Sequence, residues 1–266
     1  MTPVAKPPVV ALVGCGRLGS ALVEGWLARG AVRPADLIIL TPSSKPAAEA
    51  ARVAGARINP SPAEAGKADV VVLAVKPPTW RTALEPLAPH LGREAVVLSV
   101  MAGIAADAIA AVARRPVGRV MPTTAVAQAR GIAALWSGDE RALAAALDLF
   151  APVATTVVLE GEAQMDAATA VAGSGPAFVY AFVEALAGAG GEAGLSVNAA
   201  TELARGALRS AAAGIDTGSS LQELIARIAS PGGTTRAGLD AMRNDGDLER
   251  AARAAVEAAV RRARTL

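Results

Sequence analysis

The amino-acid sequence predicts an α/β fold in which a doubly wound sheet is followed by an all-α C-terminal domain. Two observations predict it. Between residues 9 and 159, short β-branched apolar runs alternate with alanine-rich segments of helical length. After Gly161 the β-branched runs stop, and apolar residues recur with the spacing of a helix face. We therefore expect one domain over residues 1–161 and a helical domain over residues 162–266.

The apolar runs of the first domain are expected to form strands that are covered on both faces, because they are continuous and do not alternate with polar residues. Two amphipathic segments between them, residues 18–29 and 141–150, are predicted helices. The regular strand–helix order implies right-handed crossovers and hence a parallel sheet. The expected strands are residues 9–13, 37–40, 70–75, 96–100, 117–121 and 155–159.

The helical domain is expected to be thin. In its last predicted helix the apolar stripe over residues 248–260 is mostly alanine, and Asp247 is placed to cap the start. Alanine side chains bury little area each, and about 105 residues of this kind make a weak core alone. We therefore predict that the domain buries a face against a second copy, as a homodimer.

Composition excludes several classes of protein. With one cysteine and one histidine among 266 residues, the chain lacks the ligands for a disulfide scaffold or a structural zinc site, and a nucleophilic triad would depend on His90 alone. A net charge of +2 without basic runs, and 3% aromatic residues, argue against nucleic-acid binding. The longest uncharged stretch, residues 167–183, is shorter than the roughly 20 residues of a membrane span, and the N-terminus lacks the pattern of a signal peptide. We expect a cytoplasmic protein without a metal.

A glycine turn follows the first predicted strand. Gly14, Gly16 and Gly19 have the spacing of a Rossmann-type dinucleotide site, in which the first permits a tight turn, the second admits the diphosphate and the third lets helix and strand pack closely. Arg17 and Leu18 open the following helix, whose N-terminal amides would face the phosphates. The alternative is a structural turn without a ligand.

The end of the second predicted strand favours NADP over NAD. An acidic residue there would bind the ribose hydroxyls and repel a 2′-phosphate, but Asp36 precedes the strand and so lies at the wrong end of the sheet. The strand is followed instead by Ser43, Ser44 and Lys45, two hydroxyls and an ammonium group that fit a phosphate. An ordinary polar turn is the alternative.

Two further strand ends are expected at the same crevice, because ligands of open α/β sheets bind at the carboxyl ends of the strands. Lys76 could also be an ordinary solvated surface charge. The candidate residues at these two ends are Ala74, Val75, Lys76 and Pro77, and Ala102 and Gly103.

Two glycine-rich breaks interrupt the helical domain. One contains Ser174, in Gly-Ser-Gly-Pro, and the other is Ser-Pro-Gly-Gly-Thr-Thr at residues 230–235. In the second, the backbone amides of the glycines and of the next helix N-terminus make a cradle for a carboxylate. By physics alone, such a loop is more often a simple connector between helices.

These motifs together resemble the pyrroline-5-carboxylate reductase family, in order and in spacing, from Val9 to the last helix. The Ser-Pro-Gly-Gly-Thr-Thr segment is the most specific of them. The others are the glycine turn, residues 74–77, Arg-Val-Met-Pro at 119–122 and Gly-Ser-Gly-Pro-Ala at 173–177.

The resemblance implies NADPH-dependent reduction of 1-pyrroline-5-carboxylate to L-proline, the last step of proline biosynthesis. It implies that amides of Gly232, Gly233 and Thr234 hold the substrate carboxylate, that the Thr235 hydroxyl reaches the imine nitrogen, and that Ser174 lies near the nicotinamide and the ring. It also implies dimerisation through the helical domain, often within a ring of dimers.

The sequence departs from the family at one motif. Where the family usually has Met-Pro-Asn-Thr-Pro, this chain has Thr123 and Ala125 in place of the asparagine and the second proline. The departure bears on rate or substrate range rather than on the fold.

Three alternatives stay open from the sequence. A 3-hydroxyacid dehydrogenase would need a lysine in the helical domain, and the chain has none after Lys76. A reductase of a related cyclic imine carboxylate differs by as little as one methylene, which discriminates by only about 1–3 kcal/mol. The third alternative is a catalytically silent NADPH-binding regulatory protein.

Overall fold

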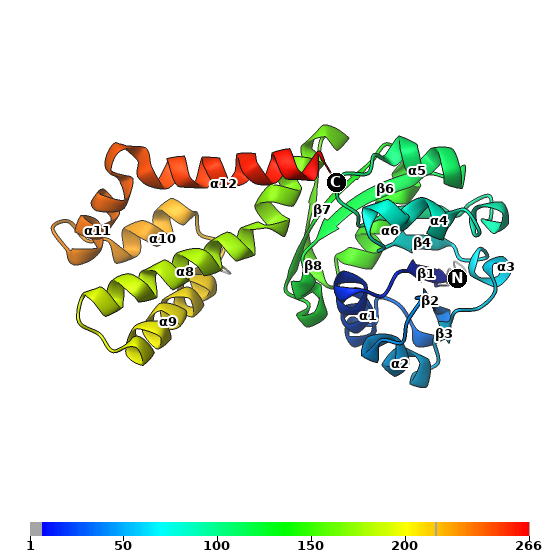
Figure 1. The fold of residues 1–266 in the computed structure, drawn as a ribbon, viewed down its shortest axis with the longest axis horizontal. Helices are drawn as coiled ribbons and strands as arrows, with labels where there is room; N and C mark the ends of the chain where they lie inside the picture. Colours follow the sequence, from blue (N-terminus) through cyan, green and yellow to red (C-terminus); the bar gives the residue numbers. More distant parts are fainter. Residues whose placement is uncertain (1–6, 216, 266) are drawn as a thin grey trace, which may run out of the picture. The chain divides into compact units, whose positions relative to one another are not determined.

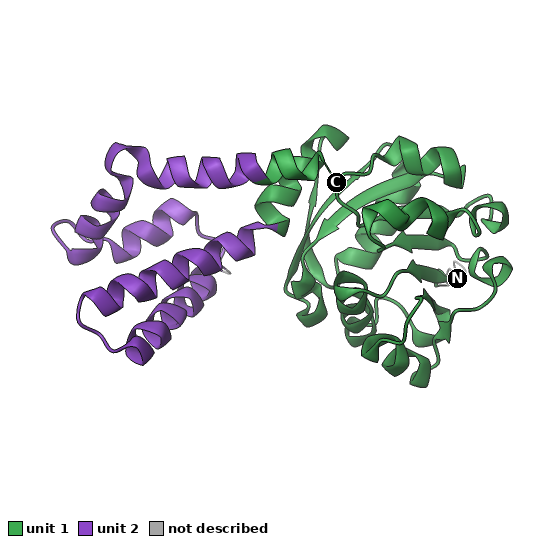
Figure 2. Ribbon diagram, viewed as in Figure 1, with its two compact units in different colours: residues 1–173, 259–266 green, residues 174–258 purple. Residues whose placement is uncertain are grey.

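The computed structural model describes residues 7–215 and 217–265. The chain forms two compact units, residues 1–173 with 259–266 (unit 1) and residues 174–258 (unit 2), shown in Figure 2. The sequence places its domain boundary between residues 161 and 162, and that boundary stays a prediction.

Unit 1 contains an eight-stranded sheet in the order β3-β2-β1-β4-β5-β6-β7-β8 (Figure 1). Neighbouring strands are parallel except β6 and β7, which pair antiparallel. The strands are β1 Val10–Val13, β2 Leu37–Leu40, β3 Arg57–Ile58, β4 Val70–Leu73, β5 Val96–Ser99, β6 Val117–Pro122, β7 Gly131–Ser137 and β8 Ala154–Val158.

The predicted doubly wound fold class is confirmed, but the sheet is mostly rather than wholly parallel. Two strands, β3 and β7, were not expected from the sequence. β7 runs antiparallel to β6 because residues 123–130, which join them, are too few for a parallel crossover of about a dozen residues or more.

Helices cover both faces of the sheet, as its continuous apolar strands predict, except at the edge strand β8, whose Val157 and Val158 are exposed; for that strand the expected burial on both faces is wrong. Val10 and Leu12 of β1 pack with α1 (Arg17–Arg29), α2 (Pro46–Val53) and α6 (Glu140–Phe150). Ala11 and Val13 point to the other face and pack with α3 (Pro62–Ala65), α4 (Trp80–Leu84) and α5 (Ala106–Ala113). The predicted helices 18–29 and 141–150 are thus confirmed to within one residue as α1 and α6.

A long helical segment leaves the sheet and continues across the unit boundary. It comprises η5 (Glu162–Gln164), α7 (Met165–Ala168), a π-helical stretch η6 (Thr169–Gly173) and α8 (Gly175–Glu192). By length and composition Glu162–Glu192 is long and apolar enough to cross a membrane, and 6% of its most apolar window is buried. One such helix is weak evidence for a membrane span, and the same exposed apolar surface is what an unpaired dimerisation face presents.

Unit 2 is helical and has little core of its own. Of the helices that it contains wholly, α8 contacts α9 (Val197–Ile215) most extensively, and α10 (Leu221–Ile228) and α11 (Thr234–Arg243) follow. No residue of α8 is buried, and its Phe178, Tyr180 and Phe182 are exposed. This agrees with the thin helical core that the alanine content predicts.

The last helix, α12, spans Asp247–Ala263 and passes from unit 2 into unit 1. Asp247 is its first helical residue rather than the residue before it, and its carboxylate pairs with the Arg250 guanidinium one turn later. The predicted helix is correct, whereas Asp247 does not occupy the expected capping position, since a 3₁₀ turn (η7, Asn244–Gly246) precedes it.

Candidate functional site

The cofactor candidates of unit 1 lie at one edge of the sheet. Val13 of β1 is in register with Leu40 of β2 and Leu73 of β4, and Leu73 is in register with Ser99 of β5. The carboxyl ends of these four parallel strands are therefore aligned. The segments that follow them contain every cofactor-binding residue expected from the sequence.

Two of the three glycines are required by packing. Gly14 has φ +99°, and a Cβ there would lie 2.6 Å from the Ala74 carbonyl oxygen. A Cβ on Gly19 would lie 2.2 Å from the Gly14 carbonyl oxygen. The Gly14 amide donates to the carbonyl of Leu40 at 2.8 Å, so the turn is fastened to the end of β2.

The middle glycine differs, because its surroundings are open. No atom lies within 4 Å of a Cβ built on Gly16, which is exposed and immediately precedes α1. Arg17 begins the helix and is exposed, and Leu18 is half-buried. The first amides of a helix have no intrahelical acceptor, so this turn fits a dinucleotide diphosphate in shape and in polarity. The neighbouring Cys15 is buried, with its Sγ 3.6 Å from the Ser20 hydroxyl.

After β2, Ser43 and Ser44 are exposed, and Lys45 immediately precedes α2. Ser44 Oγ lies 3.5 Å from a carboxylate oxygen of Glu49, which also pairs with Arg52 at 2.8 Å. The loop therefore presents two exposed serines and the half-buried Lys45, and the nearby acid of α2, Glu49, is offset by Arg52.

A second acid, Asp36, lies at the opposite end of β2. Asp36 ends a 3₁₀ turn (η1, Pro34–Asp36) at the amino end of β2, as the sequence predicts. It pairs there with Arg33, and this hydrogen-bonded contact raises the pKa of Arg33.

Asn59 shapes the same loop and was not identified from the sequence. Its side-chain oxygen accepts from the Thr41 amide at 2.8 Å, and its amide nitrogen donates to the Thr41 carbonyl at 2.9 Å. Asn59 has φ +47°, a left-handed conformation that asparagine tolerates better than most residues. The Asn-Pro dipeptide at 59–60 is the sequence signal that could have marked this turn.

The ends of β4 and β5 complete the edge. Ala74 and Val75 are half-buried, Lys76 is exposed, and Pro77 begins a 3₁₀ turn (η2, Pro77–Thr79). After β5, half-buried Ala102 precedes Gly103, which has φ +75°.

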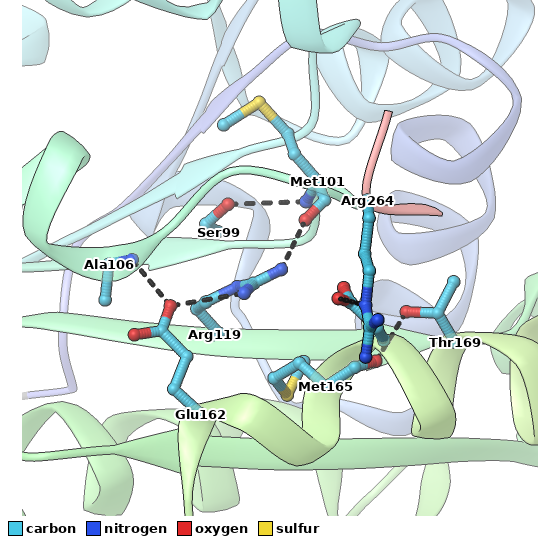
Figure 3. Close-up of polar contacts among 9 residues, drawn as sticks. Ser99, Met101, Ala106, Arg119, Glu162, Met165, Thr169 and Arg264 are labelled. Carbon is cyan, nitrogen blue, oxygen red and sulfur yellow. Dashed lines mark hydrogen bonds and ion pairs between the residues drawn. The ribbon is translucent and has the colours of Figure 1, made fainter. Parts of the chain in front are cut away.

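A partly buried ion pair lies beside the carboxyl end of β5, and its role was not predicted from the sequence. Arg119 of β6 is 5% exposed, and its Nη1 donates to Glu162 Oε1 at 3.1 Å (Figure 3). The same carboxylate oxygen accepts from the Ala106 amide at 2.7 Å, and Arg119 Nη2 lies 3.5 Å from the Met101 carbonyl oxygen. Arg119 is a charged residue inside an otherwise apolar strand, and this is the sequence signal that could have marked it.

The two departures from the family motif lie just after β6. The Thr123 hydroxyl accepts from the Ile132 amide at 3.3 Å, and the Thr123 amide donates to the Ile132 carbonyl at 3.0 Å. Thr123 therefore fastens the start of β7. The carbonyl of Ala125 accepts from the Arg130 amide at 3.1 Å and so helps to close the same turn.

The substrate candidates lie in unit 2, at the N-termini of two helices. Gly232 has φ +71°, Gly233 precedes α11, and the exposed residues Thr234 and Thr235 begin that helix. The Gly233 amide donates to the Ser230 carbonyl at 3.1 Å and is thus already engaged. The half-buried residue Ser174 immediately precedes α8.

Comparisons with known proteins match most of the chain. A family model described as pyrroline-5-carboxylate reductase dimerisation matches residues 162–266, and one described as coenzyme F420-dependent NADP oxidoreductase matches residues 9–103. The pyrroline-5-carboxylate reductase of Pseudomonas aeruginosa is 34% identical over 246 residues, 90% of each chain. A pyrroline-5-carboxylate reductase structure from Coxiella burnetii has a TM-score of 0.88 over 98% of each chain, at 26% identity. The Plasmodium falciparum pyrroline carboxylate reductase, a structure with NADP bound, has a TM-score of 0.80 over 97% of each chain, also at 26% identity.

Proposed function

This chain belongs to the pyrroline-5-carboxylate reductase family, and on that premise we propose that it reduces 1-pyrroline-5-carboxylate to L-proline with NADPH. The observation that carries the proposal is the pairing of two elements in one chain. Unit 1 has a glycine turn that is open only at Gly16, and unit 2 has the Ser-Pro-Gly-Gly-Thr-Thr loop at the start of α11. Because a member of the family is 34% identical over 90% of the chain, the 3-hydroxyacid dehydrogenase alternative falls away.

Unit 1 supplies the proposed cofactor site, where NADPH provides the hydride when it is bound. Gly14 and Gly19 shape the turn, and the amides after Gly16, at Arg17 and Leu18, face the diphosphate. The 2′-phosphate is held by Ser43, Ser44 and Lys45. The segments after β4 and β5 line the nicotinamide half, with Ala74, Val75, Lys76 and Pro77 on one side and Ala102 and Gly103 on the other.

Unit 2 supplies the proposed substrate site. Since the Gly233 amide already donates to Ser230, the amides of Gly232 and Thr234 make the carboxylate cradle, and Gly233 provides its tight turn. The Thr235 hydroxyl orients the imine nitrogen, and Ser174 contacts the ring. A protonated imine is already electrophilic, so these residues mainly bind, orient and exclude water, without a strongly ionising side chain.

We further propose a cytoplasmic homodimer formed through the helices of unit 2. The family model that matches residues 162–266 is named for dimerisation, and a second copy would cover the exposed apolar residues of α8 and α9. Covering these faces removes apolar surface from water, which stabilises the dimer by about 25 cal/mol for each Å² buried. Assembly of such dimers into a ring is part of the same proposal.

The experiment that tests the function measures NADPH consumption by the purified chain. The substrates are the five-membered and the six-membered cyclic imine carboxylates, and NADH replaces NADPH in a parallel series. Faster turnover of the five-membered ring with NADPH supports the proposal, and faster turnover of the six-membered ring assigns the related imine instead. Absence of turnover on both rings, in a folded protein that binds NADPH, would establish the silent regulatory alternative.

A further inference from the structure

We propose that the Arg119–Glu162 ion pair positions the nicotinamide half of the cofactor site by fixing both ends of the segment that follows β5. Arg119 and Glu162 are thus positioning residues. The inference rests on the proposed function, because it concerns how this chain holds the cofactor that the function requires.

The ion pair reaches both ends of this segment, residues 100–105. At the first end, the Met101 carbonyl accepts from Arg119 Nη2. The Met101 amide donates to Ser99 Oγ at 3.3 Å. At the second end, the Glu162 carboxylate accepts from the amide of Ala106, the first residue of α5. One oxygen of Glu162 therefore joins the start of α5 to the guanidinium that contacts Met101 (Figure 3).

Between these two fixed ends lie Ala102 and Gly103, the proposed cofactor contacts. Gly103 has φ +75°, a conformation in which glycine alone is unstrained, so the segment has an intrinsically permissive residue at its centre. Restraining both ends of the segment reduces the number of backbone conformations that Gly103 can adopt. The ion pair provides that restraint.

The burial of the pair argues for positioning over simple stabilisation. The side chains of Arg119 and Glu162 are 6% and 25% exposed, and the loss of hydration offsets much of the attraction between such buried charges. Among the residues that the structure describes, no acceptor reaches the buried Nε of Arg119. An apolar pair of similar size would remove the unsatisfied Nε, but it would also remove the partners of the Ala106 amide and the Met101 carbonyl, so the benefit of the charges lies in the geometry that they impose.

The sheet order indicates which half of the cofactor depends on the pair. Dinucleotides bind across the point where the strand order reverses, which here lies between β1 and β4. The loop after β2 lies on the 2′-phosphate side, and the segment after β5 lies on the opposite, nicotinamide side. Disturbing the pair should therefore weaken contacts to one half of NADPH and spare the other.

The test compares two ligands on three variants of the full chain. NADPH spans both halves of the site, whereas 2′,5′-ADP is a fragment that lacks the nicotinamide half. The variants are Glu162→Gln, the double variant Arg119→Met with Glu162→Gln, and the control Glu94→Gln. Glu94 pairs with Arg141 on the exposed surface before β5, so its loss removes an ion pair far from the carboxyl ends.

We expect Glu162→Gln to raise the dissociation constant of NADPH about tenfold, a factor typical of losing a charge-assisted hydrogen bond, while that of 2′,5′-ADP stays unchanged. The turnover number falls in parallel, and Glu94→Gln behaves as wild type in both titrations. If Glu162→Gln fails to fold because Arg119 loses its counter-ion, the double variant decides, since it removes both charges. It should fold, and it should show the same selective loss of NADPH affinity.

Two results overturn the inference. One is a folded double variant that binds NADPH and turns over substrate as wild type does. The other is an equal weakening of NADPH and 2′,5′-ADP, which indicates a general structural role. A failure of the proposed function is recognised separately, because the wild-type chain then binds NADPH without reducing either imine, whatever the variants do.

Discussion

The Gly16→Ala variant is expected to weaken NADPH binding without lowering the stability of the fold. The backbone of Gly16 has φ −75° and ψ −158°, which alanine adopts without strain, and no atom lies within 4 Å of the added methyl group. Replacing glycine at such a position stabilises a protein by about 0.4–1 kcal/mol, because the unfolded chain loses freedom. In the proposed site, the methyl group would nevertheless occupy the space that the diphosphate needs. We expect the dissociation constant of NADPH to rise at least about tenfold, which is about 1.4 kcal/mol.

Gly19→Ala is the matched comparison, because it disturbs the same turn by a different cause. Its methyl group would lie 2.2 Å from the Gly14 carbonyl oxygen, so the turn must shift. Overpacking of this kind costs about 1–3 kcal/mol of folding stability. Urea unfolding gives the stability of each variant, and quenching of protein fluorescence by NADPH gives the affinity. A Gly16→Ala variant that binds NADPH as tightly as wild type would refute the assignment of the open face to the diphosphate.

Three further predictions concern the other parts of the site. Replacing Ser44 and Lys45 together by Ala should raise the Michaelis constant for NADPH more than that for NADH, since only NADPH carries the 2′-phosphate; equal effects would contradict the assignment. Thr235→Ala should lower the turnover number at least about tenfold while NADPH affinity persists, and full activity would exclude Thr235 from the reaction. The chain should have at least twice its own mass of 26.5 kDa in solution at micromolar concentration, and a monomeric mass would contradict the proposed dimer.

Much of the fold could be predicted because its signals are local. The six apolar runs of the first domain became six strands, since each is short, continuous and made of apolar or β-branched residues, although the last of them forms the exposed edge strand β8. β7 was missed because Gly131–Ser137 contains a single β-branched residue, Ile132, and is otherwise rich in alanine and glycine. β3 has two residues, too few to produce any pattern. The antiparallel direction of β7 follows from the short connection between β6 and β7. That connection can be measured only after β7 has been recognised as a strand.

In the candidate site, too, features with a local sequence signal were predicted and features that depend on tertiary contacts were not. The glycine turn is contiguous, so its spacing and its neighbouring strand and helix predicted it together. Arg119 and Glu162 lie 43 residues apart, and only the folded sheet brings them to one carboxylate oxygen. Asn59 likewise reaches Thr41 across 18 residues. Contacts of this kind follow from tertiary placement, which no local pattern encodes.

The discontinuity of unit 1 has a consequence for how the chain unfolds. Residues 259–266 belong to unit 1, where Ala263 is buried and Arg264 lies 3.5 Å from the Asp166 carboxylate. These contacts close a loop that contains all of unit 2, and closing a disordered loop of that length carries a larger entropic cost than closing a folded one. Melting of unit 2 therefore also weakens the attachment of the last turn of α12 to unit 1. The stabilities of the two units are thermodynamically linked, so a destabilising change in the helical unit is also felt by the sheet unit.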